Sequence, residues 1–165
     1  MNMDPRALER AFEIYPEVQL VVAAHLYGFP GKADEIRAVC DAHGALLIED
    51  AAESMGATYK GRQTGSFGDY AAISYNGNKI ITGSSGGCLL TNDLEVANKA
   101  RKWSTQAREN APWYQHEEAG YNYRMSNVIA GRRPGSVSVS GRTHRPRRKP
   151  SGSATGTVCG VSLLR

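Results

Sequence analysis

Three short apolar runs, separated by turns and a helical pattern, constrain the fold of this chain most. They cover residues 19–24 (QLVVAA), 45–48 (ALLI) and 70–75 (YAAISY). Uninterrupted apolar runs of this length are typical of strands buried in a parallel sheet. A helical pattern over residues 32–43, with one apolar stripe, lies between the first two runs. The order strand, helix, strand, strand predicts an α/β fold with a mostly parallel sheet.

Polar residues follow the predicted strands at their carboxyl ends. His25 follows the first run, Asp50 the second and Lys79 the third. Ligands of parallel sheets gather at this edge. Lys79 is either a solvated loop residue or points into a site. The breaker residues 76–78 before it, the small-residue loop 83–87 after it and the upstream carboxylates favour a site.

Two further helices and a hairpin are predicted around this core. Asp4 is an N-cap followed by proline at the first helical position, and Pro16 ends that helix. Asp93 caps a helix over residues 94–108, whose basic residues lie in its second half, where the helix dipole favours them. The glycine spacing of residues 58–69 indicates a small hairpin or excursion.

The net charge of +4 is unevenly distributed. Residues 131–165 carry seven Arg, one Lys and no acid, whereas residues 1–130 are mildly acidic. The tail is rich in Gly and Ser and lacks periodicity, so it is predicted to be disordered. Such a basic arm could bind nucleic acid through its phosphates. The abrupt change within an apparent helix (NVIAG) is also what a slipped reading frame or a wrong gene model would produce, and we favour that interpretation.

Cysteine usage and hydropathy limit the compartment and exclude several classes of protein. Cys40, Cys88 and Cys159 are widely spaced and form no CxxC pair, which argues against a metal site or a disulfide framework. A reduced, cytoplasmic protein fits this pattern best. The sequence also lacks an apolar run of about 18 residues and an export signal, so no membrane association is expected.

Lys79 and Asp50 offer the two groups that an aminating enzyme with an aldehyde cofactor needs. A lysine holds such a cofactor as a Schiff base and later moves a proton. A carboxylate beside the cofactor's pyridine nitrogen favours the protonated ring, which then withdraws electrons. Ser74 and the loop before Lys79 could supply the hydroxyl and amide donors for a phosphate group.

Three segments of the chain resemble one enzyme family in fixed order: VVAAHLYGFPGKADEI, HGALLIEDAAESMGATYKGRQTGSFGDYAAISYNGNKIITGSSGGCLLTND and GYNYRMSNVIA. They are similar to the DegT/DnrJ/StrS family of pyridoxal-phosphate-dependent aminotransferases, which act mostly on nucleotide-linked keto sugars. The resemblance runs from about residue 3 to Ala130. It implies that residues 1–130 form part of the large domain of a fold-type-I aminotransferase, followed by the disordered tail 131–165.

The resemblance also implies a role for each matching residue. Lys79 in NGNK corresponds to the Schiff-base lysine, and Asp50 in IEDAAE to the partner of the pyridinium nitrogen. Glu53 stands beside the cofactor's phenolic oxygen, where many members have Gln or His. Ser74 matches the phosphate-binding serine. Asn122 in GYNYR matches an asparagine that reaches the phosphate from the neighbouring subunit, which implies a homodimer.

The implied reaction has two halves. An amino acid, usually glutamate in this family, first gives its amino group to the cofactor, and a nucleotide-linked keto sugar then receives it in amino-sugar and polysaccharide biosynthesis. A dehydratase is disfavoured because that activity goes with His in place of the lysine, whereas this chain has Lys79. His25 matches a motif near the site, without an assigned chemical step. A non-enzymatic α/β scaffold whose basic tail binds nucleic acid is the alternative from another class.

The length of the chain sets a further expectation. Family members are more than twice as long. The resemblance implies that the upstream segments that hold the phosphate and stack on the pyridine ring are missing here, as is the smaller C-terminal domain that closes over the substrate. Missing strands expose sheet edges and apolar faces. We therefore expect the polypeptide alone to be poorly stable and catalytically inactive.

Overall fold

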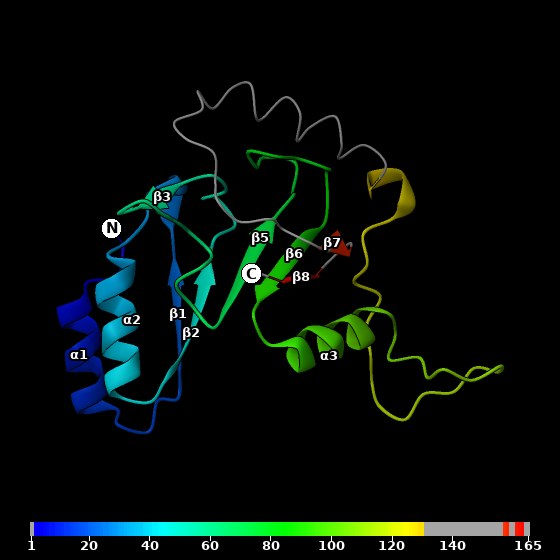
Figure 1. Ribbon diagram of the computed structural model, residues 1–165, viewed down its shortest axis with the longest axis horizontal. Helices are drawn as coiled ribbons and strands as arrows, with labels where there is room; N and C mark the ends of the chain where they lie inside the picture. The colour runs from blue at the N-terminus through cyan, green and yellow to red at the C-terminus, as the bar shows by residue number, and fades with distance from the viewer. Residues whose placement is uncertain (1, 131–156, 159–160, 164–165) are drawn as a thin grey trace. The chain divides into compact units, whose positions relative to one another are not determined.

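The computed structural model describes residues 2–130, 157–158 and 161–163, and the chain divides into two compact units, Met1–Ser74 and Tyr75–Arg165. The first unit contains α1 (Pro5–Ile14), β1 (Leu20–Ala24), η1 (Leu26–Gly28), α2 (Ala33–Ala42), β2 (Leu46–Asp50), β3 (Thr58–Tyr59), β4 (Arg62–Gln63) and β5 (Tyr70–Ser74). The second contains β6 (Gly87–Thr91), α3 (Leu94–Ser104), β7 (Thr157–Val158) and β8 (Val161–Leu163) (Figure 1).

The sheet of the first unit is parallel, as the sequence predicts. Strand β2 lies between β1 and β5, with Ala24 paired to Asp50 and Asp50 paired to Ala72. The three carboxyl ends therefore meet at one edge of the sheet. The predicted hairpin is present as the antiparallel pair β3 and β4.

Helices α1 and α2 lie side by side against the sheet of the first unit (Figure 1). The core of the unit is apolar and consists of Leu8, Phe12, Val21, Ala23, Ile36, Cys40, Ala45 and Leu47. The alternate side chains of the strands are largely exposed, with exposed fractions of 47% for Leu20, 54% for Val22 and 46% for Leu46. Burial of β1 and β2 on both faces, which the apolar runs predict, is therefore wrong for this structure.

Helix α1 begins and ends where its sequence signals predict. The Asp4 side chain accepts a hydrogen bond from the Arg6 amide at 3.0 Å, and Pro5 occupies the first helical position. Tyr15 is the C-cap, immediately before Pro16. A good N-cap contributes about 1 kcal/mol to helix stability.

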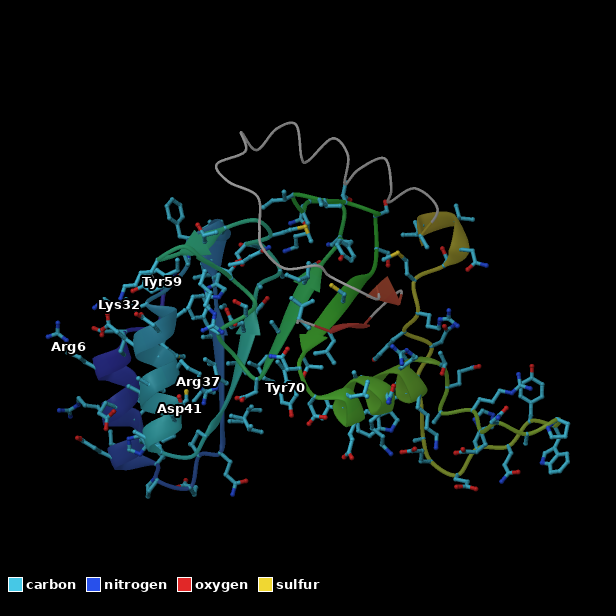
Figure 2. The ribbon with its side chains drawn as sticks, viewed as in Figure 1. Arg6, Lys32, Arg37, Asp41, Tyr59 and Tyr70 are labelled. Carbon is cyan, nitrogen blue, oxygen red and sulfur yellow. The ribbon has the colours of Figure 1, made fainter. Side chains whose placement is uncertain are left out.

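An ion-pair cluster joins α2 to the sheet of the first unit. Arg37 donates to Asp69 at 2.7 Å and lies 2.6 Å from Asp41 on the same helix (Figure 2). Asp69 also accepts from the Leu47 amide at 2.7 Å. Burial acts to raise the pKa of Asp69, but its bonds to the Leu47 amide and to Arg37 outweigh burial and lower that pKa. The cluster thus connects α2, β2 and the start of β5.

The second unit contains a parallel pair, β6 with β8, and an antiparallel pair, β8 with β7. Helix α3 begins at the predicted cap, because Asp93 accepts from the Glu95 and Val96 amides. It ends at Ser104, not at residue 108, because Gln106 and Ala107 adopt positive φ angles of 66° and 50°. The predicted tail 131–165 lies outside the described residues except in β7 and β8.

Charged side chains hold the segment after α3 against that helix. Glu118 accepts from Lys99 at 2.6 Å and from the Trp103 indole at 2.8 Å, and lies 3.0 Å from Lys102. The bonds from Lys99, Trp103 and Lys102 lower the pKa of Glu118 to about 2.

Among the described residues, no helix combines the length and the apolar character needed to cross a bilayer.

Candidate functional site

Asp50 is the last residue of β2, and its side chain is exposed at the carboxyl edge of the first unit's sheet. Its Oδ1 accepts from the Ala52 amide at 3.1 Å, which caps the following turn. Its main-chain carbonyl accepts from the His25 amide at 3.0 Å. One oxygen of the carboxylate is therefore held by the Ala52 amide, and the residue stays exposed at this edge.

Glu53 lies half-buried in the turn after β2 and is held by η1. Its Oε2 accepts from the Tyr27 amide at 2.8 Å. Tyr27 and Gly28 both have positive φ angles, and a Cβ on Gly28 would lie 3.0 Å from the Glu53 carbonyl oxygen. The sequence did not reveal that the Tyr27 amide binds Glu53, although the neighbouring Gly28 in the HLYG motif indicates a turn at this place.

Ser74 ends β5 and is half-buried at the same edge as Asp50. It lies two residues beyond Ala72, which pairs with Asp50. The first unit thus brings a carboxylate and a hydroxyl to adjacent strand ends, as the predicted parallel sheet requires.

The second unit contains Lys79 and the small-residue loop. The Lys79 amide donates to the Asn76 carbonyl at 3.1 Å, and the side chain is half-buried. The loop returns to its own start, because the Gly83 amide donates to the Tyr75 carbonyl and the Tyr75 amide donates to the Gly86 carbonyl, each at 2.8 Å. These bonds set the backbone from which Lys79 projects.

Two glycines of this loop approach side chains of the same unit. A Cβ on Gly83 would lie 2.8 Å from Cγ2 of Ile129, and one on Gly86 would overlap Met125. Gly86 also has a φ of 93°, which disfavours any other residue. Because Gly83 and Gly86 lack a Cβ, the side chains of the 125–129 segment of the same unit can pack against the loop.

Asn122 lies beyond α3 in the second unit. It forms an isolated antiparallel bridge with Thr105, and its side chain is exposed. The adjacent Tyr121 amide donates to the Trp103 carbonyl at 2.6 Å. The backbone around Asn122 is therefore fixed to the end of α3.

Glu49 and His25 form a buried pair that sequence reasoning did not predict. Their exposed fractions are 1% and 3%, and His25 Nε2 lies 2.9 Å from Glu49 Oε2. Burial acts to raise the pKa of Glu49, but the bonds from His25 and from the amides of Gly68, Gly65 and Phe67 lower it below its ordinary value. The alternation of β2, which puts Glu49 on the same face as buried Leu47, could have revealed it.

A hollow of about 530 Å³ lies in the first unit, close to η1. Its lining includes the cations of Arg6 and Lys32 and the rings of Tyr27, Phe29 and Tyr59 (Arg6, Lys32 and Tyr59 are labelled in Figure 2). Tyr27, whose amide binds the Glu53 side chain, also lines this hollow.

Residues 1–132 match the model of the DegT/DnrJ/EryC1/StrS aminotransferase family. EpsN of Bacillus subtilis (strain 168), which carries the name of a pyridoxal phosphate-dependent aminotransferase, is 53% identical over 134 residues, or 79% of this chain and 34% of EpsN. GDP-perosamine synthase of Caulobacter vibrioides is 43% identical over 129 residues, which are 78% of this chain and 34% of that synthase. The dTDP-3-amino-3,4,6-trideoxy-alpha-D-glucose transaminase of Streptomyces venezuelae is 35% identical over 130 residues, which are 78% of this chain and 33% of that transaminase.

Solved structures show the same fold. Helicobacter pylori PseC, an aminotransferase of pseudoaminic acid biosynthesis, superposes with a TM-score of 0.78 at 20% identity, over 86% of this chain and 38% of PseC. DesI, solved with its TDP-sugar product, superposes with a TM-score of 0.73 at 31% identity, over 86% of this chain and 35% of DesI. The chain therefore spans about a third of the length of the relatives it matches.

Proposed function

The chain belongs to the DegT/DnrJ/EryC1/StrS aminotransferase family, and on this premise we propose that it carries cofactor-binding residues of a pyridoxal-phosphate-dependent transfer of an amino group to a nucleotide-linked keto sugar. The placement of Asp50 and Ser74 at one edge of the first unit's sheet carries the proposal. The names of the relatives, which describe a GDP-perosamine synthase and a dTDP-amino-sugar transaminase, support the class of substrate.

The residues of the first unit fit pyridoxal phosphate by their chemistry. Asp50 keeps one carboxylate oxygen outside its local bond to Ala52, so it can accept from a protonated pyridine nitrogen. Glu53, fixed by the Tyr27 amide, would face the phenolic oxygen. The Ser74 hydroxyl would donate to the phosphate. When bound, the cofactor supplies a cationic ring that withdraws electrons from the reacting carbon.

Lys79 and Asn122 are the proposed residues of the second unit. The Lys79 amine would hold the aldehyde and later carry a proton at the substrate carbon. Asn122 would donate to the phosphate of a neighbouring subunit, so we include a homodimer in the proposal. We further propose that glutamate is the amino donor. We also propose that the protein is located in the cytoplasm. Cys40 is a buried thiol outside any disulfide, which is compatible with a reducing compartment.

Borohydride trapping tests the role of Lys79. Purified 165-residue chain is mixed with pyridoxal phosphate, reduced with borohydride and digested. Peptide mass spectrometry should then locate one dominant phosphopyridoxyl adduct on Lys79. The variant Lys79→Ala should lose this adduct, whereas Lys32→Ala, which removes an exposed lysine of the first unit, should keep it. Labelling spread evenly over the surface lysines would contradict the proposal.

We also propose that the chain by itself does not complete the reaction, because its match covers about a third of its relatives. An unreduced sample loaded with pyridoxal phosphate is therefore assayed for 2-oxoglutarate after addition of glutamate. Without a keto acceptor, the first half-reaction can release at most one equivalent per bound cofactor, and we expect the chain to attach the cofactor but to release none. Release of one equivalent by the wild-type chain, absent in Lys79→Ala, would refute this part of the proposal and leave the cofactor role intact.

A further inference from the structure

The buried pair of His25 and Glu49 has no part in the roles assigned above. A carboxylate that is 1% exposed is costly unless donors match its oxygens. Its surroundings are largely apolar and include Ala23, Ala33, Ile36 and Leu47. A buried charge in such a place needs bonds to the protein itself.

Four donors match the two oxygens of Glu49. Oε1 accepts from the Phe67 amide at 2.5 Å and the Gly68 amide at 2.6 Å. Oε2 accepts from the Gly65 amide at 2.8 Å and from the His25 ring at 2.9 Å. Three of these donors belong to the loop that enters β5. The carboxylate therefore fixes that loop to the end of β2.

The hydrogen bonds of His25 determine the state of its ring. An ionised carboxylate only accepts, so Nε2 must carry the hydrogen that faces Glu49. Nδ1 accepts from the Gly31 amide at 3.4 Å. The two bonds together require a neutral ring with its proton on Nε2. The main-chain amide of His25 also donates to the Asp50 carbonyl at 3.0 Å.

These contacts connect the pair to both acidic residues of the candidate site, to Asp50 through its main chain and to Glu53 through its side chain. His25 binds the main chain of Asp50, and two residues later the Tyr27 amide binds the side chain of Glu53. We propose that His25 and Glu49 are positioning residues, which hold the η1 turn and the 65–68 loop so that the carboxylates of Asp50 and Glu53 keep fixed places. The consequence for cofactor binding rests on the proposed function, whereas the local geometry does not.

The first test needs no cofactor. Nitrogen NMR of the 165-residue chain at neutral pH should report the neutral Nε2–H tautomer for His25. Hydrogen exchange should show strong protection of the Gly65, Phe67 and Gly68 amides. A ring protonated on Nδ1, or amides that exchange as fast as exposed ones, would overturn the inference.

The second test compares Glu49→Gln with Asp69→Asn. Asp69 is a matched control because it also accepts from a backbone amide and from a side-chain nitrogen in the first unit, here from Leu47 of β2 and Arg37 of α2. Glu49→Gln should speed exchange of the Tyr27 amide and weaken pyridoxal phosphate binding by about tenfold. Asp69→Asn should lower Tm and leave both quantities within about twofold. Equal effects of the two variants would reduce Glu49 to a stabilising role and refute positioning.

His25 provides a rescue experiment. His25→Gln can still donate to Glu49, whereas His25→Ala cannot, so Tyr27 exchange should be closer to wild type in His25→Gln. Equal exchange in the two variants would contradict the inference, and this comparison decides the question if Glu49→Gln does not fold. If the wild-type chain binds no pyridoxal phosphate, the proposed function fails, and the tautomer and exchange measurements still decide the positioning role.

Discussion

Asp50 combines a structural hydrogen bond with an exposed charge, and the two can be separated by substitution. Asp50→Asn keeps an oxygen that accepts from the Ala52 amide, so the free energy of unfolding should change by less than about 0.5 kcal/mol. The variant lacks the charge that favours a protonated pyridine nitrogen, so pyridoxal phosphate affinity should fall by about tenfold or more. Denaturant titration and absorbance titration measure the two effects. Unchanged affinity would remove Asp50 from the site.

Glu49 should make stability depend on acidic pH. Its pKa lies below the ordinary value of 4.5. A carboxylate with a lowered pKa contributes its stability above the unfolded-state pKa and loses it as the pH falls through the folded-state pKa. The advantage of wild type over Glu49→Gln in the free energy of unfolding should thus be constant above about pH 5.5 and shrink below about pH 4.5.

Urea unfolding at a series of pH values checks this expectation. The comparison with Glu49→Gln cancels the contributions of other carboxylates with lowered pKa values, including Asp34 and Asp69. An advantage that stays constant down to about pH 3 would show that ionisation of Glu49 does not stabilise the fold.

Among the elements, the loop that enters β5 depends on Gly68. A Cβ there would lie 2.6 Å from the Leu47 carbonyl oxygen and 2.9 Å from that of Tyr70. Both are backbone atoms of sheet strands and cannot move aside, so Gly68→Ala should destabilise the chain by about 1–3 kcal/mol. Gly77→Ala is the matched control because a Cβ at Gly77 has no described neighbour within 4 Å. Equal unfolding midpoints for the two variants would contradict the close approach.

The stability of helix α3 depends on the hydrogen bonds of its N-cap, Asp93. Asp93 accepts from two backbone amides at the start of the helix. Asp93→Ala should cost about 1 kcal/mol, whereas Asp93→Asn should cost much less because its oxygen still accepts. Chemical denaturation of both variants measures the difference. A cost for Asp93→Asn as large as that for Asp93→Ala would mean that the charge, rather than the cap, stabilises α3.

At the scale of the molecule, the exposed apolar side chains of β1 and β2 should govern association. The outward-facing Leu20, Val22 and Leu46 form an apolar surface of the kind that drives association. We expect the chain to associate beyond a dimer as its concentration rises. Val22→Thr should reduce this association, and Leu94→Gln, an exposed position of the second unit, should not. Sedimentation velocity measures both, and equal behaviour of the two variants would exclude this surface.

The sequence predicts the arrangement of elements well because their signals are local. The caps Asp4 and Asp93, and the apolar runs that become β1, β2 and β5, are readable from neighbouring residues. The end of α3 is not, because it depends on positive φ angles at Gln106 and Ala107, which are not glycines. The exposure of alternate β1 residues also escapes the sequence, since an apolar run does not show which face is covered.

In the candidate site too, features set by local sequence are predictable, whereas features set by contacts between distant residues are not. Asp50 and Ser74 are predictable because parallel strands place their carboxyl ends at one edge. The bond between the Tyr27 amide and Glu53 is not, because it joins residues 26 positions apart through a strained turn. Burial of Glu49 follows from donors in a loop that lies 16 to 19 residues further along the chain.

The register of the parallel sheet bears on how quickly the first unit folds. Leu20 pairs with Leu46, and Ile48 pairs with Tyr70, so each strand pair closes a segment of fewer than 30 residues. Short closures lose little chain entropy and are associated with fast folding. The three strands also pair in the order in which they leave the ribosome. We therefore expect the sheet of this unit to form during synthesis, once Ser74 has emerged from the ribosome and before the whole second unit has followed it.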